Sequence, residues 1–175
     1  MPSLPMGSRL VLQIEPLAAA TFAPFGDVIE VAAETRRYSI NQGYAERFHD
    51  LARIDSGGEG GQTLVSIFRA RPRTLPFRLS LIERHRLGSQ AFMPLSRQRF
   101  LVVVAAAGPV PRVEQLRCFV AASGQGVNYA AGVWHHPLLA IDAGGDFLVI
   151  DRGGQGAASD CEEHVLDERE VWIDG

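Results

Sequence analysis

The stretch Phe100-Leu-Val-Val-Val-Ala105 contains no polar residue and gives the clearest indication of the fold of this chain. Successive side chains of a β-strand point to opposite faces, so a strand of this composition must be covered on both faces. We therefore predict that residues 100–105 form a central strand with a packed layer on either side.

Shorter β signals precede and follow this strand, and clusters of glycine and proline at residues 56–61, 108–111, 123–126 and 153–154 separate them. The further predicted strands are residues 10–14, 27–31, 63–69, 77–83, 117–120 and 146–150. Helical signals are limited to residues 18–25, which Gly26 would end, and to a short turn at 113–116. Many short strands with closely spaced turns predict an all-β antiparallel sandwich or barrel in one domain.

Composition and charge exclude several classes of function. The chain has 175 residues, 46% of them hydrophobic, so one domain can bury a core without disulfides. The net charge of −3 and the scattered basic residues argue against nucleic acid as a partner. All 17 basic residues are arginine, and the absence of lysine excludes Schiff-base catalysis and the lysine-containing phosphate loop.

Three further observations concern the cellular setting. Cys118 and Cys161 lie far apart without a CxxC pair, which is typical of a reducing compartment and offers no thiolate metal site. The longest apolar run is too short to cross a membrane, and no signal peptide is visible at the N-terminus. We therefore expect a cytoplasmic protein without a membrane partner.

Adjacent histidines occur in Trp134-His135-His136-Pro137, just after Gly132. On a strand, only one of the two imidazoles can point into the interior, and the other faces a second sheet, a neighbouring subunit or solvent. Imidazole titrates near neutral pH and therefore suits metal binding or proton transfer. The alternative is a structural histidine bonded to a backbone carbonyl.

A second polar cluster begins at Glu83-Arg84-His85-Arg86 and continues to Gln90. A turn at Gly88 would place His85 and Gln90 on facing or successive strands that converge on one cavity. A carboxylate, an imidazole and an amide in so short a window would serve a metal or a polar substrate, although a solvated strand end explains them equally well.

Three alternating arginines, Arg69, Arg71 and Arg73, offer guanidinium groups that can bind a carboxylate through two parallel hydrogen bonds. Pro72 argues against a central strand beyond Arg69, so we expect Arg71 and Arg73 to lie on a solvated edge. Arg69 is nearest to the apolar run at residues 64–68, and we expect it to be held in place.

Several of these blocks, taken in order, resemble the ureidoglycolate lyase family, also known as ureidoglycolate hydrolase. The resemblance extends from about Leu12 to the acidic C-terminal strand, nearly the whole chain. The blocks are Leu12-Gln-Ile-Glu-Pro-Leu17, Phe25-Gly-Asp-Val-Ile-Glu30, Ile40-Asn-Gln-Gly43, Glu46-Arg-Phe-His-Asp50, Glu83-Arg-His85, Gly88-Ser-Gln-Ala-Phe-Met-Pro94, Gln125-Gly-Val-Asn-Tyr129, Trp134-His-His-Pro-Leu138 and residues 147–152.

The resemblance implies a cupin-type antiparallel β-barrel or jelly roll with few short helices, usually assembled as a homodimer. It implies cleavage of (S)-ureidoglycolate to glyoxylate and urea, a carbon–nitrogen lyase reaction of allantoin (purine) degradation. Residues 1–10 are then an extra, flexible leader, and residues 11–175 form a single cupin-like catalytic domain.

The resemblance also implies a site. Gly132 and His135 match the second cupin motif, whereas the two histidines of the usual first motif are replaced by His85 and Gln90. His85, Gln90 and His135 are therefore the expected ligands of nickel or another divalent metal, and no organic cofactor is expected.

The chemistry of the expected substrate assigns the remaining roles. Proton transfer falls to His135, His85, Tyr129 or an acidic residue. For the carboxylate we expect either Arg69 or the backbone amides of residues 88–90, which include Ser89. For the ureido group we expect Gln90, Asn128 and Tyr129.

Two other functions fit the same pattern. The first is a metal-dependent cupin oxygenase or isomerase, which oxygen consumption or bound iron would favour. The second is a non-catalytic cupin that binds a small ligand, which tight binding of ureidoglycolate or glyoxylate without turnover would favour.

Overall fold

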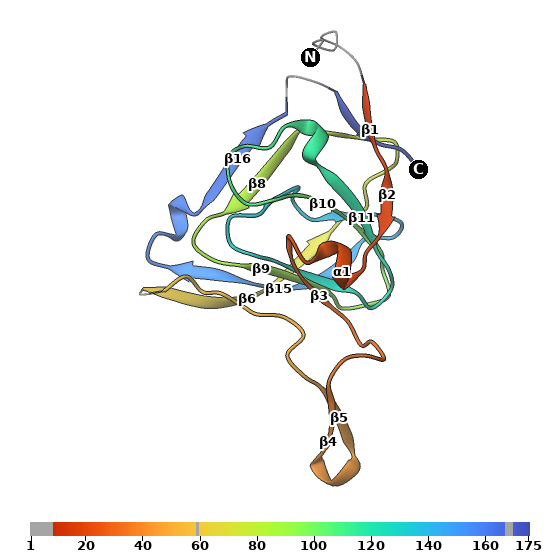
Figure 1. Cartoon of the computed structure of the whole chain (residues 1–175), viewed down its shortest axis with the longest axis vertical. Coiled ribbons are helices and arrows are strands. Elements are labelled where there is room, and N and C mark those ends of the chain that lie inside the picture. The colour runs from red at the N-terminus through yellow and green to blue at the C-terminus, as the bar shows by residue number, and fades with distance from the viewer. Residues whose placement is uncertain (1–8, 59, 167–169) are drawn as a thin grey trace.

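A computed structural model describes residues 9–58, 60–166 and 170–175, and β-strands dominate it (Figure 1). The five-stranded sheet has the order β3 (Gly26–Ile29), β12 (Gly126–Tyr129), β9 (Gln90–Pro94), β15 (Gly145–Gly154) and β6 (Gly61–Ala70). The seven-stranded sheet has the order β16 (Cys161–Val165), β8 (Leu81–His85), β13 (Trp134–His135), β10 (Phe100–Ala105), β11 (Arg117–Ala121) and β2 (Ile14–Pro16), and β14 (Leu139–Ala140) also pairs with β10. The three-stranded sheet consists of β1 (Leu10–Leu12), β17 (Val171–Ile173) and β7 (Phe77–Leu79).

Two hydrophobic cores hold these sheets together. In the first core, Phe92 and Phe147 of the five-stranded sheet pack with Val102 and Phe119 of the seven-stranded sheet. The second core lies between the seven-stranded and three-stranded sheets and includes Leu101, Val103, Leu79 and Val171. The architecture is therefore all-β and cupin-like, as predicted.

Strand β10 contributes alternate residues to the two cores, and all six of its residues are buried. It pairs with β11 along one edge and with β13 and β14 along the other. The prediction of a central strand covered on both faces is confirmed.

Some predicted strands are divided between sheets. The predicted strand 10–14 forms β1 and β2, and the predicted strand 77–83 forms β7 and β8. In each case the chain leaves the three-stranded sheet after the first part and joins the seven-stranded sheet with the second. The predicted helix at 18–25 is confined to α1 (Ala19–Phe22), and the turn at 113–116 is the 3-10 helix η2 (Val113–Gln115).

Residues 1–8 of the predicted leader lie outside the described residues, whereas Leu10 belongs to β1. A hairpin of β4 (Arg37–Ile40) and β5 (Ala45–Phe48), joined by the 3-10 helix η1 (Asn41–Gly43), projects from the body of the molecule (Figure 1). A further 3-10 helix, η3 (Ala157–Ser159), precedes β16. Among the described residues, no helix is long and apolar enough to cross a membrane.

Candidate active site

Two neighbouring strands bring a carboxylate and two imidazoles together. Glu83 and His85 are two residues apart on β8, which places them on one face of that strand. Strand β13 pairs with β8 so that His135 lies directly opposite Glu83. Ligand atoms of the three side chains all lie within 4.8 Å of one another. Sequence reasoning found Glu83 in the same window as His85 but did not include it among the ligands, because only the β8–β13 register places it opposite His135.

The hydrogen bonding of His135 fixes its tautomer. Its Nδ1 lies 3.0 Å from the carbonyl oxygen of Val133, which only accepts hydrogen bonds, so Nδ1 carries the proton. Its Nε2, which lies 3.6 Å from Oε1 of Glu83, carries the lone pair when the ring is neutral. The ring also stacks on Tyr129, with centroids 4.2 Å apart and planes 14° apart. His135 is 1% exposed, so its orientation is fixed by packing on every side.

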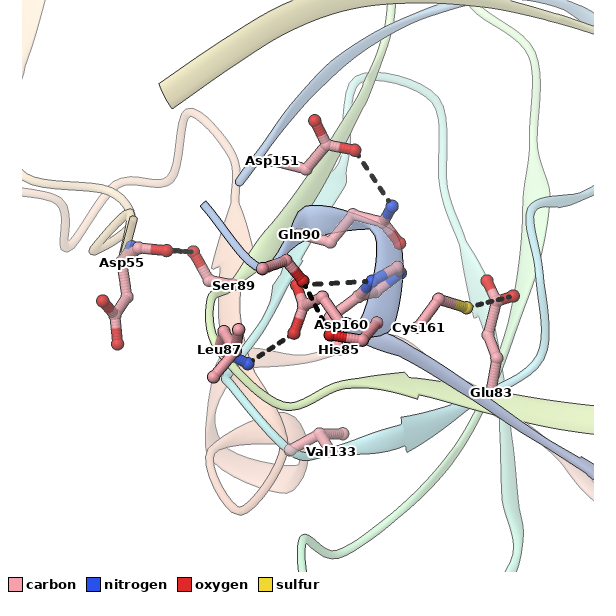
Figure 2. A network of polar contacts seen from close by, with 12 residues as sticks. Asp55, Glu83, His85, Leu87, Ser89, Gln90, Val133, Asp151, Asp160 and Cys161 are labelled. Carbon is pink, nitrogen blue, oxygen red and sulfur yellow. Dashed lines mark hydrogen bonds and ion pairs between the residues drawn. The ribbon is translucent and has the colours of Figure 1, made fainter. Parts of the chain in front are cut away.

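His85 adds a second imidazole to the same cluster. Its Nδ1 lies 3.9 Å from Oδ2 of the buried Asp160, and Figure 2 shows the two side chains facing each other. Its Nε2 is buried and has no hydrogen-bond partner within the described part of the chain. Burial lowers the pKa of His85 and the charge of His135 lowers it further, while Glu83, Asp160 and Asp151 act in the opposite direction. His85 is therefore a neutral imidazole at neutral pH.

The carboxyl group of Glu83 is ionised. Burial acts to raise its pKa, but the neighbouring imidazoles of His135 and His85 outweigh this effect, and the pKa lies below its usual range. When both imidazoles are neutral, a carboxylate oxygen faces their lone pairs, an arrangement of acceptors without a donor. A shared cation or proton between them resolves this conflict.

Gln90 at the start of β9 adds an amide oxygen. Its Nε2 donates a hydrogen bond of 3.3 Å to Oδ2 of Asp151, as Figure 2 shows, which leaves Oε1 buried and without a partner among the described residues. The two imidazole nitrogens and the carboxylate of the cluster form a donor set that divalent transition metals accept. The outer contacts of the imidazoles to a carbonyl and a carboxylate match the way metal-binding histidines are usually oriented. The residues present therefore fit a divalent metal.

The structure does not bring Ser89 and Asn128 to the imidazoles. Both occupy positions next to inward-facing residues, and strand alternation therefore directs them to the outer face of the five-stranded sheet. The Ser89 hydroxyl accepts a hydrogen bond of 2.8 Å from the backbone of Asp55. The Asn128 amide donates bonds of 2.9 Å to Asp27 and to the carbonyl of Arg53. Both side chains thereby hold residues 53–55, the covering segment of this face.

Arg69 and His136 also lie apart from the cluster. The guanidinium of Arg69 forms two hydrogen bonds with Asp146, of 2.7 and 2.9 Å, and its side chain is 83% exposed. His136 is buried, donates to the carbonyl of Pro137 at 2.7 Å and packs edge-on against Phe77. As strand alternation predicts, one of the two adjacent histidines enters the cluster.

A cavity of about 580 Å³ borders the cluster. Glu83 and Gln90 contribute to its wall on one side, and residues 68–73 line another side at the end of β6. Its size suits a small polar molecule. An all-β, cupin-like fold with a carboxylate, two imidazoles and an amide beside an open cavity defines a small-molecule site of the cupin class.

Comparison with known proteins specifies this class. The family model described as ureidoglycolate lyase matches residues 9–174, and the chain belongs to the ureidoglycolate lyase family. A protein named ureidoglycolate lyase from Burkholderia mallei (strain NCTC 10229) is 56% identical over 162 residues, which cover 93% of this chain and 92% of that protein. Proteins of the same name from Burkholderia cepacia and Pseudomonas syringae pv. syringae (strain B728a) are 51% and 47% identical, each over 93% of this chain and over 90% and 94% of their own lengths. This membership identifies the chain as an enzyme of the lyase class.

Proposed function

We propose that this enzyme cleaves (S)-ureidoglycolate to glyoxylate and urea. The observation that carries the proposal is the cluster of Glu83, His85 and His135, in which Glu83, together with Gln90, lines a cavity of about 580 Å³. The names of the related proteins supply the substrate.

The reaction requires proton transfer and charge stabilisation. One carbon of ureidoglycolate carries a hydroxyl group, a carboxylate and the urea nitrogen. Removal of the hydroxyl proton lets the C–O bond become the carbonyl of glyoxylate, while the C–N bond breaks and its electron pair leaves with nitrogen. Protonation of that nitrogen completes urea. The balance needs one base and one acid, and neither an oxidant nor a reductant.

The imidazoles of His85 and His135 support this reaction in one of two ways. As neutral bases, either can accept the hydroxyl proton, a contribution of about 10²–10⁴ in rate for a well-placed group. Alternatively, together with Glu83 and Gln90 they would hold a divalent cation such as nickel. When bound, that cation would polarise the substrate oxygens and lower the pKa of the hydroxyl group.

Tyr129 is suited to the role of proton donor. Burial raises the pKa of its phenol, and the charges of Glu83 and Cys118 raise it further. The phenol therefore stays protonated at neutral pH, and its stacking on His135 holds it against the cluster. We assign it to protonation of the leaving nitrogen, a role that the conservative change Tyr129→Phe tests.

The test is a coupled assay that measures glyoxylate and urea from ureidoglycolate, with and without prior treatment with a chelator. We expect equal amounts of the two products. Ammonia in place of urea would indicate an amidohydrolase, oxygen consumption would indicate an oxygenase, and binding without turnover would indicate a ligand-binding protein. Loss of activity on chelation, restored by nickel, assigns the imidazoles to the metal. Full activity of metal-free protein assigns them to proton transfer.

We also propose that the enzyme is a homodimer and works in the cytoplasm. The outer face of the five-stranded sheet exposes apolar side chains at its edge strand, where Val65 is 69% and Ile67 53% exposed. Their cross-strand partners Ile150 and Leu148 extend this apolar surface. The free Cys118 and Cys161 support a reducing compartment. Light scattering tests the dimer: Val65→Glu together with Ile67→Glu should give monomers, and an unchanged dimer would refute this interface.

A further inference from the structure

The proposed reaction calls for a positive charge at the substrate carboxylate, and no arginine belongs to the cluster of Glu83, His85 and His135. The chain contains no lysine, so this cation must be an arginine, a protonated histidine or a metal. Three arginines, Arg69, Arg71 and Arg73, border the cavity that also contacts Glu83 and Gln90. These three differ in how available each is to bind an anion.

Arg69 is already neutralised. Its two hydrogen bonds to Asp146 use the planar fork that would otherwise bind a substrate carboxylate. The register of β6 with β15 places the two residues directly opposite each other, on the face of the sheet away from the buried Phe147. A substrate at Glu83 would therefore have to compete with a carboxylate that is permanently present beside Arg69.

Arg71 and Arg73 form no ion pair with any carboxylate among the described residues, and they differ in how firmly they are held. The backbone N–H of Arg73 donates a hydrogen bond of 2.8 Å to the carbonyl of Ala140. Its guanidinium lies 5.6 Å from the centre of the Phe77 ring. Arg71 has no comparable contact in the described part of the chain.

Phe77 also places Arg73 close to β13, the strand that carries His135. The Phe77 ring packs edge-on against His136, with centroids 5.5 Å apart, and His136 directly follows His135 of the cluster. Burial is the main reason for the lowered pKa of His136, and the charge of Arg73 adds to it, as expected for a guanidinium near this imidazole. Arg73 and Pro137 then line the same cavity as Glu83.

We infer that Arg73 binds the carboxylate of the substrate, with the hydroxyl-bearing carbon directed towards Glu83 and Gln90. This inference rests on the proposed function, and it assigns Arg73 a specificity for α-hydroxy carboxylates. A guanidinium suits this task because it stays charged at every physiological pH and matches a carboxylate with two parallel hydrogen bonds. The aromatic face of Phe77 limits its motion without neutralising its charge.

The experiment compares Arg73→Gln with Arg71→Gln and with the control Arg97→Gln, which alters an arginine outside the cavity. For Arg73→Gln we expect kcat/KM for ureidoglycolate to fall about 10- to 100-fold, mainly through KM, as for loss of a hydrogen-bonded charge pair. Arg73→Lys should recover part of the loss, because it restores the charge but not the fork. Thermal melting of each variant checks that it is folded. If Arg73→Gln does not fold, Arg73→Lys takes its place in the comparison.

Binding of glycolate, with glycolamide as the probe that lacks a carboxylate, separates this inference from the proposed function. We expect calorimetry to show weaker glycolate binding in Arg73→Gln and little discrimination between the two probes. If wild-type protein turns over ureidoglycolate but Arg73→Gln behaves as Arg97→Gln does, the inference fails and the function stands. If wild-type protein is inactive but binds glycolate through Arg73, the function fails and the anion site stands. A KM effect in Arg71→Gln alone would transfer the role to Arg71 and overturn the inference.

Discussion

The inner and outer faces of strands β9 and β12 have different roles. The difference is clearest between residues that are adjacent in the sequence. Gln90 and Tyr129 lie opposite each other on the inner face, where they meet Asp151 and His135. Ser89 immediately precedes Gln90 and Asn128 immediately precedes Tyr129, yet both bind the covering segment on the outer face. The side chains of residues one position apart therefore lie on opposite faces of the sheet. Inner-face variants should affect catalysis, and outer-face variants should affect stability.

The largest effect is expected from the inner face. His135→Ala removes a lone pair from the cluster and the ring that stacks on Tyr129, and kcat should fall about 10²–10⁴-fold. The control is His164→Ala on β16, whose ring contacts Trp134 outside the cluster. Steady-state assays of both variants check this. Similar losses in the two would show that the site lies elsewhere.

The next largest effect contrasts the two faces directly. Asn128 is 1% exposed and donates two hydrogen bonds, so Asn128→Ala should lower the free energy of unfolding by about 1–3 kcal/mol while kcat stays near wild type. Gln90→Ala, on the inner face, should instead lower kcat with a smaller change in stability. Urea denaturation and turnover are measured on both proteins. A loss of kcat in folded Asn128→Ala would restore the substrate contact expected from the sequence.

The fold can be predicted where composition alone determines burial. The apolar strand at residues 100–105 specifies two covered faces, and the structure supplies both. The sequence does not predict strands β9 and β12, because β12 has only four residues and β9 begins with the polar Gln90, so neither shows a long apolar alternation. At β9, the side chain that faces the cavity also weakens the signal for a strand.

The candidate site can be predicted in part. The resemblance to a family points to His85, Gln90 and His135, and the structure brings His85 and His135 together with Glu83, whereas Gln90 lines a cavity beside Glu83. The resemblance does not show which of Gln90 and Ser89 faces the inside of the sheet, because that depends on the register of β9 against β12. The sequence also favours Arg69 for its position beside an apolar run, whereas the Asp146 partner becomes visible only when β6 pairs with β15. Long-range register is the information that a single sequence lacks.

A smaller effect concerns the dependence of stability on pH. Burial lowers the pKa of His136 in the folded protein, and the carbonyl of Pro137 only partly offsets this. Below the unfolded value of about 6.5 the unfolded chain binds more protons, so stability is full above that pH and falls as pH decreases towards the folded pKa. His136→Gln should therefore lose less stability than wild type between about pH 8 and about pH 5.5. Urea midpoints of chelator-treated protein at the two pH values check this, and equal losses would show that His136 does not contribute.

The smallest effect is expected at the exposed ion pair on the outer face. Arg69 is bonded to Asp146, but solvent screens the pair, and exposed pairs of this kind contribute little to stability. Because this carboxylate neutralises Arg69 before any substrate arrives, Arg69→Gln should leave both the urea midpoint and KM for ureidoglycolate close to wild type. The same measurements on Asp146→Asn, which removes the other member of the ion pair, provide the matched comparison. A raised KM in Arg69→Gln with an unchanged midpoint would mean that Arg69 exchanges Asp146 for the substrate, and the separation of the two faces would fail at this edge of the sheet.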